Sequence, residues 1–192
     1  MIKLSYDVND YRRQISEAVN DGDCIIELGC HTGNTSKVIL QNDVKLIALD
    51  NSPEASKEMD KLDLTFINAD VRLHDTLSEV FKITQKCDIL AIDLGGGYHP
   101  DTVFKVFYIW SSTFKPKHTF IRNRGLVEFY NSISEAKGDY KSEDGFLDSY
   151  KDSGIPPQIK EFDLWTPMLK KKHKFNYFLF FSTVINSINY LM

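Results

Sequence analysis

The sequence predicts an α/β protein, a three-layer sandwich in which a mostly parallel, twisted sheet lies between two layers of helices. Short apolar runs alternate with amphipathic segments, and a glycine turn follows the first clear run. The runs end at Glu27, Asp50, Asp70 and Asp93, which are 23, 20 and 23 residues apart. This spacing equals one strand plus one helix. We therefore expect the four acids at one edge of the sheet, where the carboxyl ends of parallel strands lie.

The N-terminal segment, residues 1–21, is expected to form a helix that precedes the first strand, because apolar side chains recur every four residues from Tyr11. Arg12 and Arg13 are expected on its solvated face. Pro53 follows a serine and precedes an acid, which is typical of a helix start. The expected strands are 24–28, 44–49, 64–67, 89–92 and 118–121, and the expected helices are 35–41, one from Pro53, one around 73–81, 100–114 and 125–136.

The C-terminal third is expected to complete the same domain. Residues 137–157 are polar and contain glycines and a proline pair, which favours an extended loop or lid over the active edge. Residues 158–165 and 175–184 are expected to form a closing antiparallel pair of strands, separated by the basic run 170–174. The 192 residues, 42% of them apolar, suffice for one domain, so residues 1–192 are predicted to be a single unit.

Composition excludes several classes of protein. A net charge of −4 argues against a surface coated with basic residues for nucleic acid. Cys24, Cys30 and Cys87 show neither paired nor C-x-x-C spacing, so we expect neither a disulfide framework nor a metal site. The sequence starts with no signal-peptide pattern and has no apolar run of ~18 residues. We therefore expect a soluble, cytoplasmic protein with no membrane partner.

The glycine turn, Glu27-Leu28-Gly29-Cys30-His31-Thr32-Gly33, indicates the kind of ligand. The dinucleotide fingerprint requires glycines where this chain has His31 and Asn34, and no phosphate-loop string occurs. The turn resembles the first motif of class I S-adenosylmethionine-dependent methyltransferases, although many members have a glycine in place of His31. Its Gly29-x-x-x-Gly33 spacing is closer to a form found in some ribose methyltransferases that act on ribosomal RNA.

This resemblance implies a Rossmann-like methyltransferase fold with S-adenosyl-L-methionine as cofactor. It places Asp50 at the ribose diol, and Asp70 beside the adenine amino group with the Val71 N–H on the ring. It places Glu27 near the methionine moiety. Structural roles remain open: a turn acid for Asp50, a helix cap for Asp70, and an acceptor of loop amides for Glu27. The expected cofactor-binding set is Glu27, Gly29, Cys30, His31, Gly33, Asp50, Asn51, Asp70, Val71 and Asp93.

The candidate catalytic residues are Asp93, His99 and Arg122. Asp93 opens the segment Asp-Leu-Gly-Gly-Gly-Tyr-His-Pro, which in the resembled family lies where methyl donor and acceptor meet. His99 is suited to general-base work, or it caps the following helix. Arg122 is expected to pair with Asp93, as a lysine does in rRNA ribose methyltransferases; alternatively, Arg122 and Arg124 bind a phosphate or carboxylate.

Two functions follow from these patterns. The first is an S-adenosylmethionine-dependent methyltransferase whose acceptor is RNA or a small molecule, with RNA preferred because of Arg122, Arg124 and the run 170–174. The second is a non-catalytic module that keeps the fold and acts as a partner subunit. His31 in the glycine turn and the incomplete set of groups around Asp93 support this second function.

Overall fold

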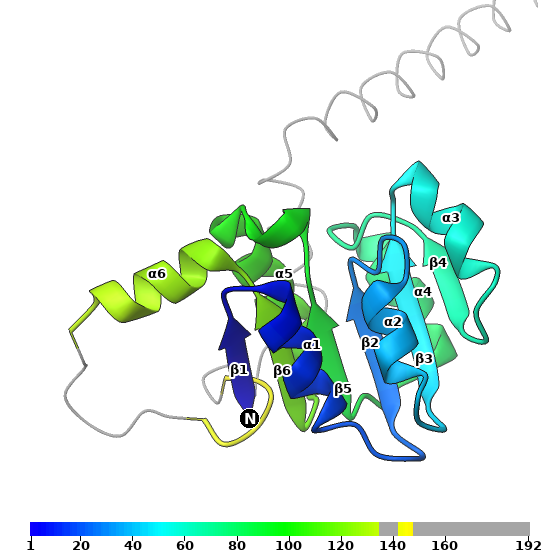
Figure 1. Cartoon of the computed structure of the whole chain (residues 1–192), viewed down its shortest axis with the longest axis horizontal. Helices are drawn as coiled ribbons and strands as arrows, with labels where there is room; N and C mark the ends of the chain where they lie inside the picture. The colour runs from blue at the N-terminus through cyan, green and yellow to red at the C-terminus, as the bar shows by residue number, and fades with distance from the viewer. Residues whose placement is uncertain (135–141, 148–192) are drawn as a thin grey trace, which may run out of the picture.

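One parallel sheet of six strands organises the computed structural model, which describes residues 1–134 and 142–147 (Figure 1). The order across the sheet is β1-β6-β5-β2-β3-β4, and every neighbouring pair is parallel. The order reverses between β2 and β5, and such a switch point is where open α/β sheets bind ligands. The strands are β1 (Ile2–Ser5), β2 (Cys24–Leu28), β3 (Lys45–Asp50), β4 (Thr65–Asn68), β5 (Ile89–Ile92) and β6 (His118–Arg122).

Helices cover both faces of the sheet because successive strand side chains point to opposite faces. Ile25 of β2 packs in one core with residues of α1, α2 and α3, and Ile26 packs in the other with residues of α4 and α5. Figure 1 shows α1 and α2 in front of the sheet and α5 behind it. The helices are α1 (Val8–Ser16), α2 (Asn34–Ile39), α3 (Pro53–Met59), α4 (His74–Ile83), α5 (Pro100–Phe114) and α6 (Arg124–Ser132), with a 3₁₀ turn at Gly95–Gly97.

The predicted fold class and the alternation of strands and helices are confirmed, with boundaries within a few residues. β1 is the exception, since the N-terminal segment contains a strand as well as the expected helix. Ile2 pairs with Thr119 and Ser5 with Arg122, so β1 lies beside β6 at the edge of the sheet. A strand of four residues carries little periodicity of its own, and its partner lies more than 110 residues away in sequence. The expected strands 158–165 and 175–184, including the antiparallel last strand, and the basic run 170–174 lie outside the described residues.

Part of the expected lid, residues 142–147, lies at the end of the sheet opposite to the switch-point edge. The Gly145 N–H donates to the carbonyl oxygen of Pro116 at 3.0 Å, and its own carbonyl accepts from the Thr119 hydroxyl. Phe146 is buried. These contacts hold the segment against the turn before β6, at the amino ends of the strands. This part of the segment is therefore not positioned as a lid; the rest of 137–157 lies outside the described residues.

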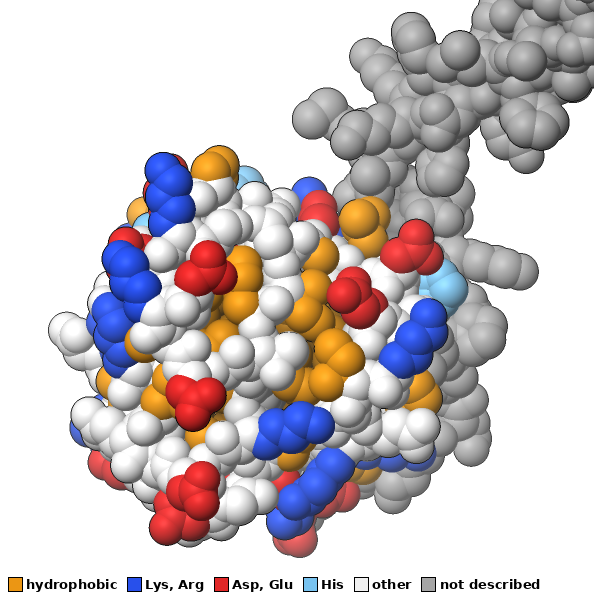
Figure 2. All heavy atoms as spheres, turned by 90° about the vertical axis from the view of Figure 1, so that its right-hand side faces the viewer, with side chains coloured by type: hydrophobic (Ala, Val, Ile, Leu, Met, Phe, Trp, Pro, Cys, Tyr) orange, Lys and Arg blue, Asp and Glu red, His pale blue; other side chains and the backbone are white. Residues whose placement is uncertain are grey.

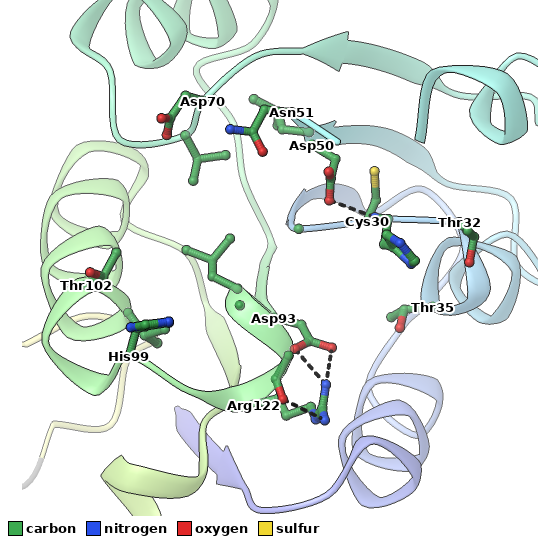
Figure 3. A pocket seen from close by; sticks show the side chains of 18 of the residues that line it. Cys30, Thr32, Thr35, Asp50, Asn51, Asp70, Asp93, His99, Thr102 and Arg122 are labelled. Atoms are coloured by element: carbon green, nitrogen blue, oxygen red, sulfur yellow. Dashed lines mark hydrogen bonds and ion pairs between the residues drawn. The ribbon is translucent and has the colours of Figure 1, made fainter. Parts of the chain in front are cut away.

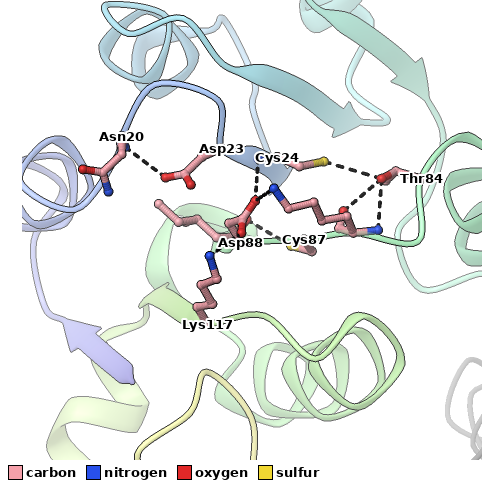
Figure 4. Close-up of polar contacts among 9 residues, drawn as sticks. Asn20, Asp23, Cys24, Thr84, Cys87, Asp88 and Lys117 are labelled. Atoms are coloured by element: carbon pink, nitrogen blue, oxygen red, sulfur yellow. Dashed lines mark hydrogen bonds and ion pairs between the residues drawn. The ribbon is translucent and has the colours of Figure 1, made fainter.

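A buried carboxylate ties three strands together at this amino end (Figure 4). Asp88, which precedes β5, accepts from the Cys24 backbone N–H at 2.9 Å. It also pairs with the ammonium groups of Lys86 at 2.8 Å and Lys117 at 2.9 Å. Burial by itself raises the pKa of Asp88. The N–H and the two lysines have the larger, opposite effect, and the resulting pKa is about 2. Asp88 therefore stays ionised and links β2, β5 and the start of β6.

Within the described residues, β4 forms the edge of the sheet farthest from β1, and its one partner there is β3. Figure 2 views this side and shows hydrophobic side chains in the centre with acidic and basic side chains around them. Charges of both signs around a free edge discourage pairing with another strand. Within the described ranges, no helix combines the length and apolar character needed to cross a membrane.

Candidate functional site

A cavity of about 720 Å³ lies at the carboxyl ends of the strands, above the switch point between β2 and β5 (Figure 3). Its volume is within the range of small-molecule and cofactor sites. The loops after β2, β3, β4 and β5 contribute to its wall, together with the last residue of β6 and residues of α1, α2 and α5. The predicted site residues that line it are Gly29, Cys30, His31, Asp50, Asn51, Asp70, Val71, Asp93, His99 and Arg122.

Gly29 allows the first turn to pack closely against the end of β5. Its φ is +90°, and a Cβ placed on it would lie 2.3 Å from the carbonyl oxygen of Asp93. Gly33 also has a positive φ, but a Cβ there would meet Leu62 and Met59, so it packs toward α3 and does not line the cavity. Close packing inside the fold explains why both positions require glycine. The backbone of Gly29 also lines the cavity.

His31 adopts the left-handed conformation that glycine usually provides, with a φ of +46°. Its backbone N–H donates to Oδ2 of Asp50 at 2.9 Å, and its side chain is exposed at the margin of the cavity. Asp50 accepts a second N–H, from Ser52, at 2.7 Å on Oδ1. Each oxygen of Asp50 keeps a further lone pair, so the carboxylate is oriented and can still accept from a ligand.

Asp70 is held by a cation that the sequence pattern did not single out. Nε and Nη2 of Arg72 donate to the two oxygens of Asp70 at 2.9 and 2.6 Å, and the Arg72 backbone N–H donates at 2.9 Å. Burial raises the pKa of Asp70, but Arg72 outweighs it and the pKa is lowered. The neighbouring Val71 carbonyl accepts the indole N–H of Trp110 at 2.9 Å, which fixes this turn to α5.

Asp93 and Arg122 form the expected ion pair on the opposite side of the cavity from Asp50 and Asp70 (Figure 3). Nη1 of Arg122 lies 3.0 and 3.1 Å from the two carboxylate oxygens, and Nη2 donates to the Gly96 carbonyl at 3.1 Å. Burial raises the pKa of Asp93 even though Arg122 acts in the opposite direction. Asp93 therefore has a higher proton affinity than an ordinary aspartate.

His99 occupies the N-cap position of α5, but its side chain makes no capping hydrogen bond. Its backbone is left-handed, with φ of 58°, and the residue lines the cavity with Thr102 of the same helix (Figure 3). His99 therefore caps α5 only by its backbone position. Its imidazole is not used in capping.

Arg12 is a site residue that the sequence prediction placed wrongly. It lines the cavity, and its Nε donates to the Thr35 hydroxyl at 3.1 Å. Arg13 is exposed, as expected, and pairs with Glu17 at 2.8 Å. Val8 lies one helical turn before Arg12 and also lines the cavity. This spacing of four residues was the available signal, since it places both side chains on one face of α1.

Glu27 does not line the cavity. It is 2% exposed, and its Oε2 accepts from the Ser36 hydroxyl of α2 at 2.6 Å. Burial raises the pKa of Glu27 to about 7. The partner of Glu27 is thus a hydroxyl of α2 beneath the glycine turn. The expected roles were a place near the methionine moiety or hydrogen bonds from loop amides, and this contact is neither.

The reversed strand order, the helices on both faces and the cavity at the switch point define a Rossmann-like α/β protein. No protein-family model matches the chain, and no curated protein matches it in sequence. Solved structures are similar in architecture. A candidate rRNA methylase from Clostridium thermocellum has 12% identity and a TM-score of 0.49, covering 72% of this chain and 90% of that one. An rRNA methylase from Streptococcus thermophilus has 11% identity and a TM-score of 0.44, with coverages of 64% and 77%.

A third similar structure is a Burkholderia thailandensis methyltransferase that contains 1,6-didemethyltoxoflavin and S-adenosylhomocysteine. It has 14% identity and a TM-score of 0.39, covering 56% of this chain and 50% of that one. Because these TM-scores are below 0.5, the similarities assign no activity to the chain.

Proposed function

We propose that the chain is an S-adenosyl-L-methionine-dependent methyltransferase that binds cofactor and acceptor in the cavity above the switch point. One observation carries this proposal: Asp50, Asp70 and Asp93, from the ends of three different strands, meet around a single cavity beside the bare backbone of Gly29. S-adenosylmethionine requires such a combination, because its sugar, its base and its charged methionine tail need different partners along one crevice.

The polar groups of the cavity wall fit the cofactor in one orientation, with its ribose at Asp50 and its base at Asp70. Asp50, oriented by the N–H groups of His31 and Ser52, would accept hydrogen bonds from the ribose diol. Ala69 and Val71, next to Asp70, offer apolar surface for a base. Asp70 keeps its charge through Arg72, and we assign it to the exocyclic amino group of the base, which would share this carboxylate with Arg72.

Arg12 fits the methionine end of the cofactor. It is the cation that α1 contributes to the wall, and its observed side-chain partner is the neutral hydroxyl of Thr35. No carboxylate within the described residues pairs with Arg12. An arginine in this state is suited to a carboxylate ligand, which its planar fork binds in a bidentate manner. Glu27 lies beneath the turn, and we assign it no direct contact.

The bound cofactor supplies an electrophilic methyl group on a sulfonium. The chain then has to align the acceptor in line with that methyl group and exclude water. Asp93 is placed to accept the proton of an acceptor hydroxyl or amine, and its raised pKa favours this task. Arg122 orients Asp93 through their ion pair, and a guanidinium, which has no free acceptor, cannot itself take the proton. His99 is the second candidate base on this side of the cavity.

Calorimetric titration of the full chain with S-adenosylmethionine and S-adenosylhomocysteine tests cofactor binding. Asp50→Ala is expected to weaken binding by about 1.5–3 kcal/mol, because charge-assisted hydrogen bonds to the diol are lost. Asp60→Ala is the matched control, since Asp60 is an exposed acid at the end of α3 and does not line the cavity. Absence of heat with the unmodified chain at millimolar ligand would end the proposal, and unchanged affinity in Asp50→Ala would remove the ribose assignment.

A non-catalytic module that retains cofactor binding is the second candidate. It is favoured by one observation, namely that Arg122 engages both oxygens of Asp93, leaving this acid less available to a substrate. Transfer of a labelled methyl group to total RNA or to a metabolite extract distinguishes the two. Binding without transfer to either pool supports the module. Arg122 and Arg124 favour RNA as the acceptor, and transfer only to the metabolite pool would contradict that preference.

A further inference from the structure

Three consecutive residues where β6 ends and α6 begins hold the glycine loop that follows β5. Arg122 donates to the Gly96 carbonyl at 3.1 Å. The side-chain amide of Asn123, which is fully buried, donates to the Tyr98 carbonyl at 2.8 Å. Nη1 of Arg124 donates to the Tyr98 hydroxyl at 2.9 Å. Despite its three glycines, the loop is therefore fixed, and Tyr98 is held both by its backbone and by its ring.

The guanidinium of Arg124 also contacts two aromatic rings. Its Cζ lies 5.3 Å from the centre of the Tyr98 ring and 5.5 Å from the centre of the Tyr6 ring, within cation–π range. Both tyrosines are nevertheless accessible, since Tyr98 is 56% exposed and Tyr6 is 47% exposed. No carboxylate among residues 1–134 and 142–147 pairs with Arg124. The result is an oriented and exposed aromatic surface with one cation against it, and the Tyr6 hydroxyl at its margin donates to Glu128 at 3.4 Å.

This surface borders the cavity on the side of Asp93. Gly96 and His99 lie on either side of Tyr98 in the loop, and both line the cavity. Arg122, which pairs with Asp93, is separated in the chain by Asn123 alone from Arg124, which holds the Tyr98 ring. Tyr98 does not itself line the cavity, so this surface adjoins the cavity through these two neighbours.

We propose that Tyr98, positioned by Arg124 and Asn123, is the stacking platform for a planar heteroaromatic acceptor, that is, an unstacked nucleobase or a free nucleotide. This inference rests on the proposed function and assigns the acceptor class of the same site. An exposed ring with one cation against it offers a π surface to a base and a positive charge to its phosphate. Stacking requires an exposed ring with a fixed orientation, which the contacts of Arg124 and Asn123 provide.

Fluorescence anisotropy with a labelled, single-stranded oligoribonucleotide of about 12 nucleotides tests the platform in the full chain, with and without S-adenosylhomocysteine. Calorimetry with the four nucleoside 5′-monophosphates tests the free-nucleotide source. Tyr98→Ala is expected to weaken binding roughly 5- to 100-fold, and Tyr98→Phe is expected to bind within about 3-fold of the unmodified chain, because the π surface remains. Loss for the oligoribonucleotide alone identifies RNA, and loss for the monophosphates as well identifies a free nucleotide.

Tyr130→Ala is the matched control, because Tyr130 is also an exposed tyrosine, at 69% against 56% for Tyr98, and lies on α6. It is expected to bind like the unmodified chain. Equal loss in Tyr98→Ala and Tyr130→Ala, or no loss in Tyr98→Ala, overturns the platform. Absence of binding to either probe by a chain that binds S-adenosylhomocysteine overturns the platform and leaves the proposed function standing. Affinity for S-adenosylhomocysteine is expected to be the same in Tyr98→Ala and the unmodified chain.

Discussion

Asp88 and Asp93 stand at the two ends of β5 and differ in what surrounds them. Asp88 receives a backbone N–H from Cys24 and two ammonium groups, from Lys86 and Lys117, and its pKa is about 2. Asp93 receives one guanidinium, and burial keeps its pKa above the ordinary value. Of the two aspartates that flank β5, Asp88 is thus fixed as an anion and Asp93 has an increased proton affinity.

This difference suggests which acid is structural and which is chemical. Donors that outweigh the cost of burial hold Asp88 ionised at neutral pH, which suits a link between strands. Incomplete compensation at Asp93 favours proton uptake, which suits general-base chemistry next to a cavity.

Replacing the two acids separately is expected to give the largest contrast, in the rate of methyl transfer. Asp93→Asn should lower kcat by about 100- to 10,000-fold, because the group that accepts the acceptor's proton is lost. Asp88→Asn should leave kcat per folded molecule unchanged. In the unmodified chain, kcat should fall with decreasing pH as Asp93 is protonated, around a pKa above that of an ordinary aspartate. A comparable loss in both variants would break the distinction between the two ends.

Gly29→Ala tests how closely the site end is packed. Its Cβ would approach the Asp93 carbonyl oxygen to 2.3 Å, so the substitution should destabilise the fold by about 2–5 kcal/mol, combining backbone strain with overpacking. Gly22 also has a positive φ, of +84°, but apart from its chain neighbours no atom of the described residues lies within 4 Å of its Cβ position. Gly22→Ala should therefore cost only the backbone strain, about 1–2 kcal/mol. Urea unfolding measures both, and equal costs would show that the close approach to β5 is unimportant.

A smaller effect, about 1.5–3 kcal/mol of unfolding free energy at neutral pH, is expected for Asp88→Asn, because charged hydrogen bonds are lost. The folded pKa of Asp88, about 2, is below the ordinary aspartate value, so its stabilisation is present above about pH 4. The stabilisation is lost as the pH falls from about 4 to about 2. Urea unfolding across this range should therefore show the variant and the unmodified chain converging at low pH. A constant difference between them would contradict the role assigned to Asp88.

The sequence predicted the elements that repeat and the acids that end them, because hydrophobic periodicity and the strand-plus-helix spacing are local properties. It failed where a contact depends on a distant partner. β1 is recognisable only by its pairing with β6, and the direction of Arg12 depends on where α1 packs relative to the turn after β2. Arg72 has a local partner, but its contact with Asp70 requires the particular turn after β4.

The hydrogen bond from the Trp110 indole to the Val71 carbonyl has a mechanical consequence. Trp110 belongs to α5, and the same helix begins beside His99. The turn expected to meet the base of the cofactor and the residue expected to meet the acceptor are therefore attached to one rigid body. A displacement of α5 changes both halves of the crevice together, so occupancy of one half and the shape of the other are coupled through the close-packed interior.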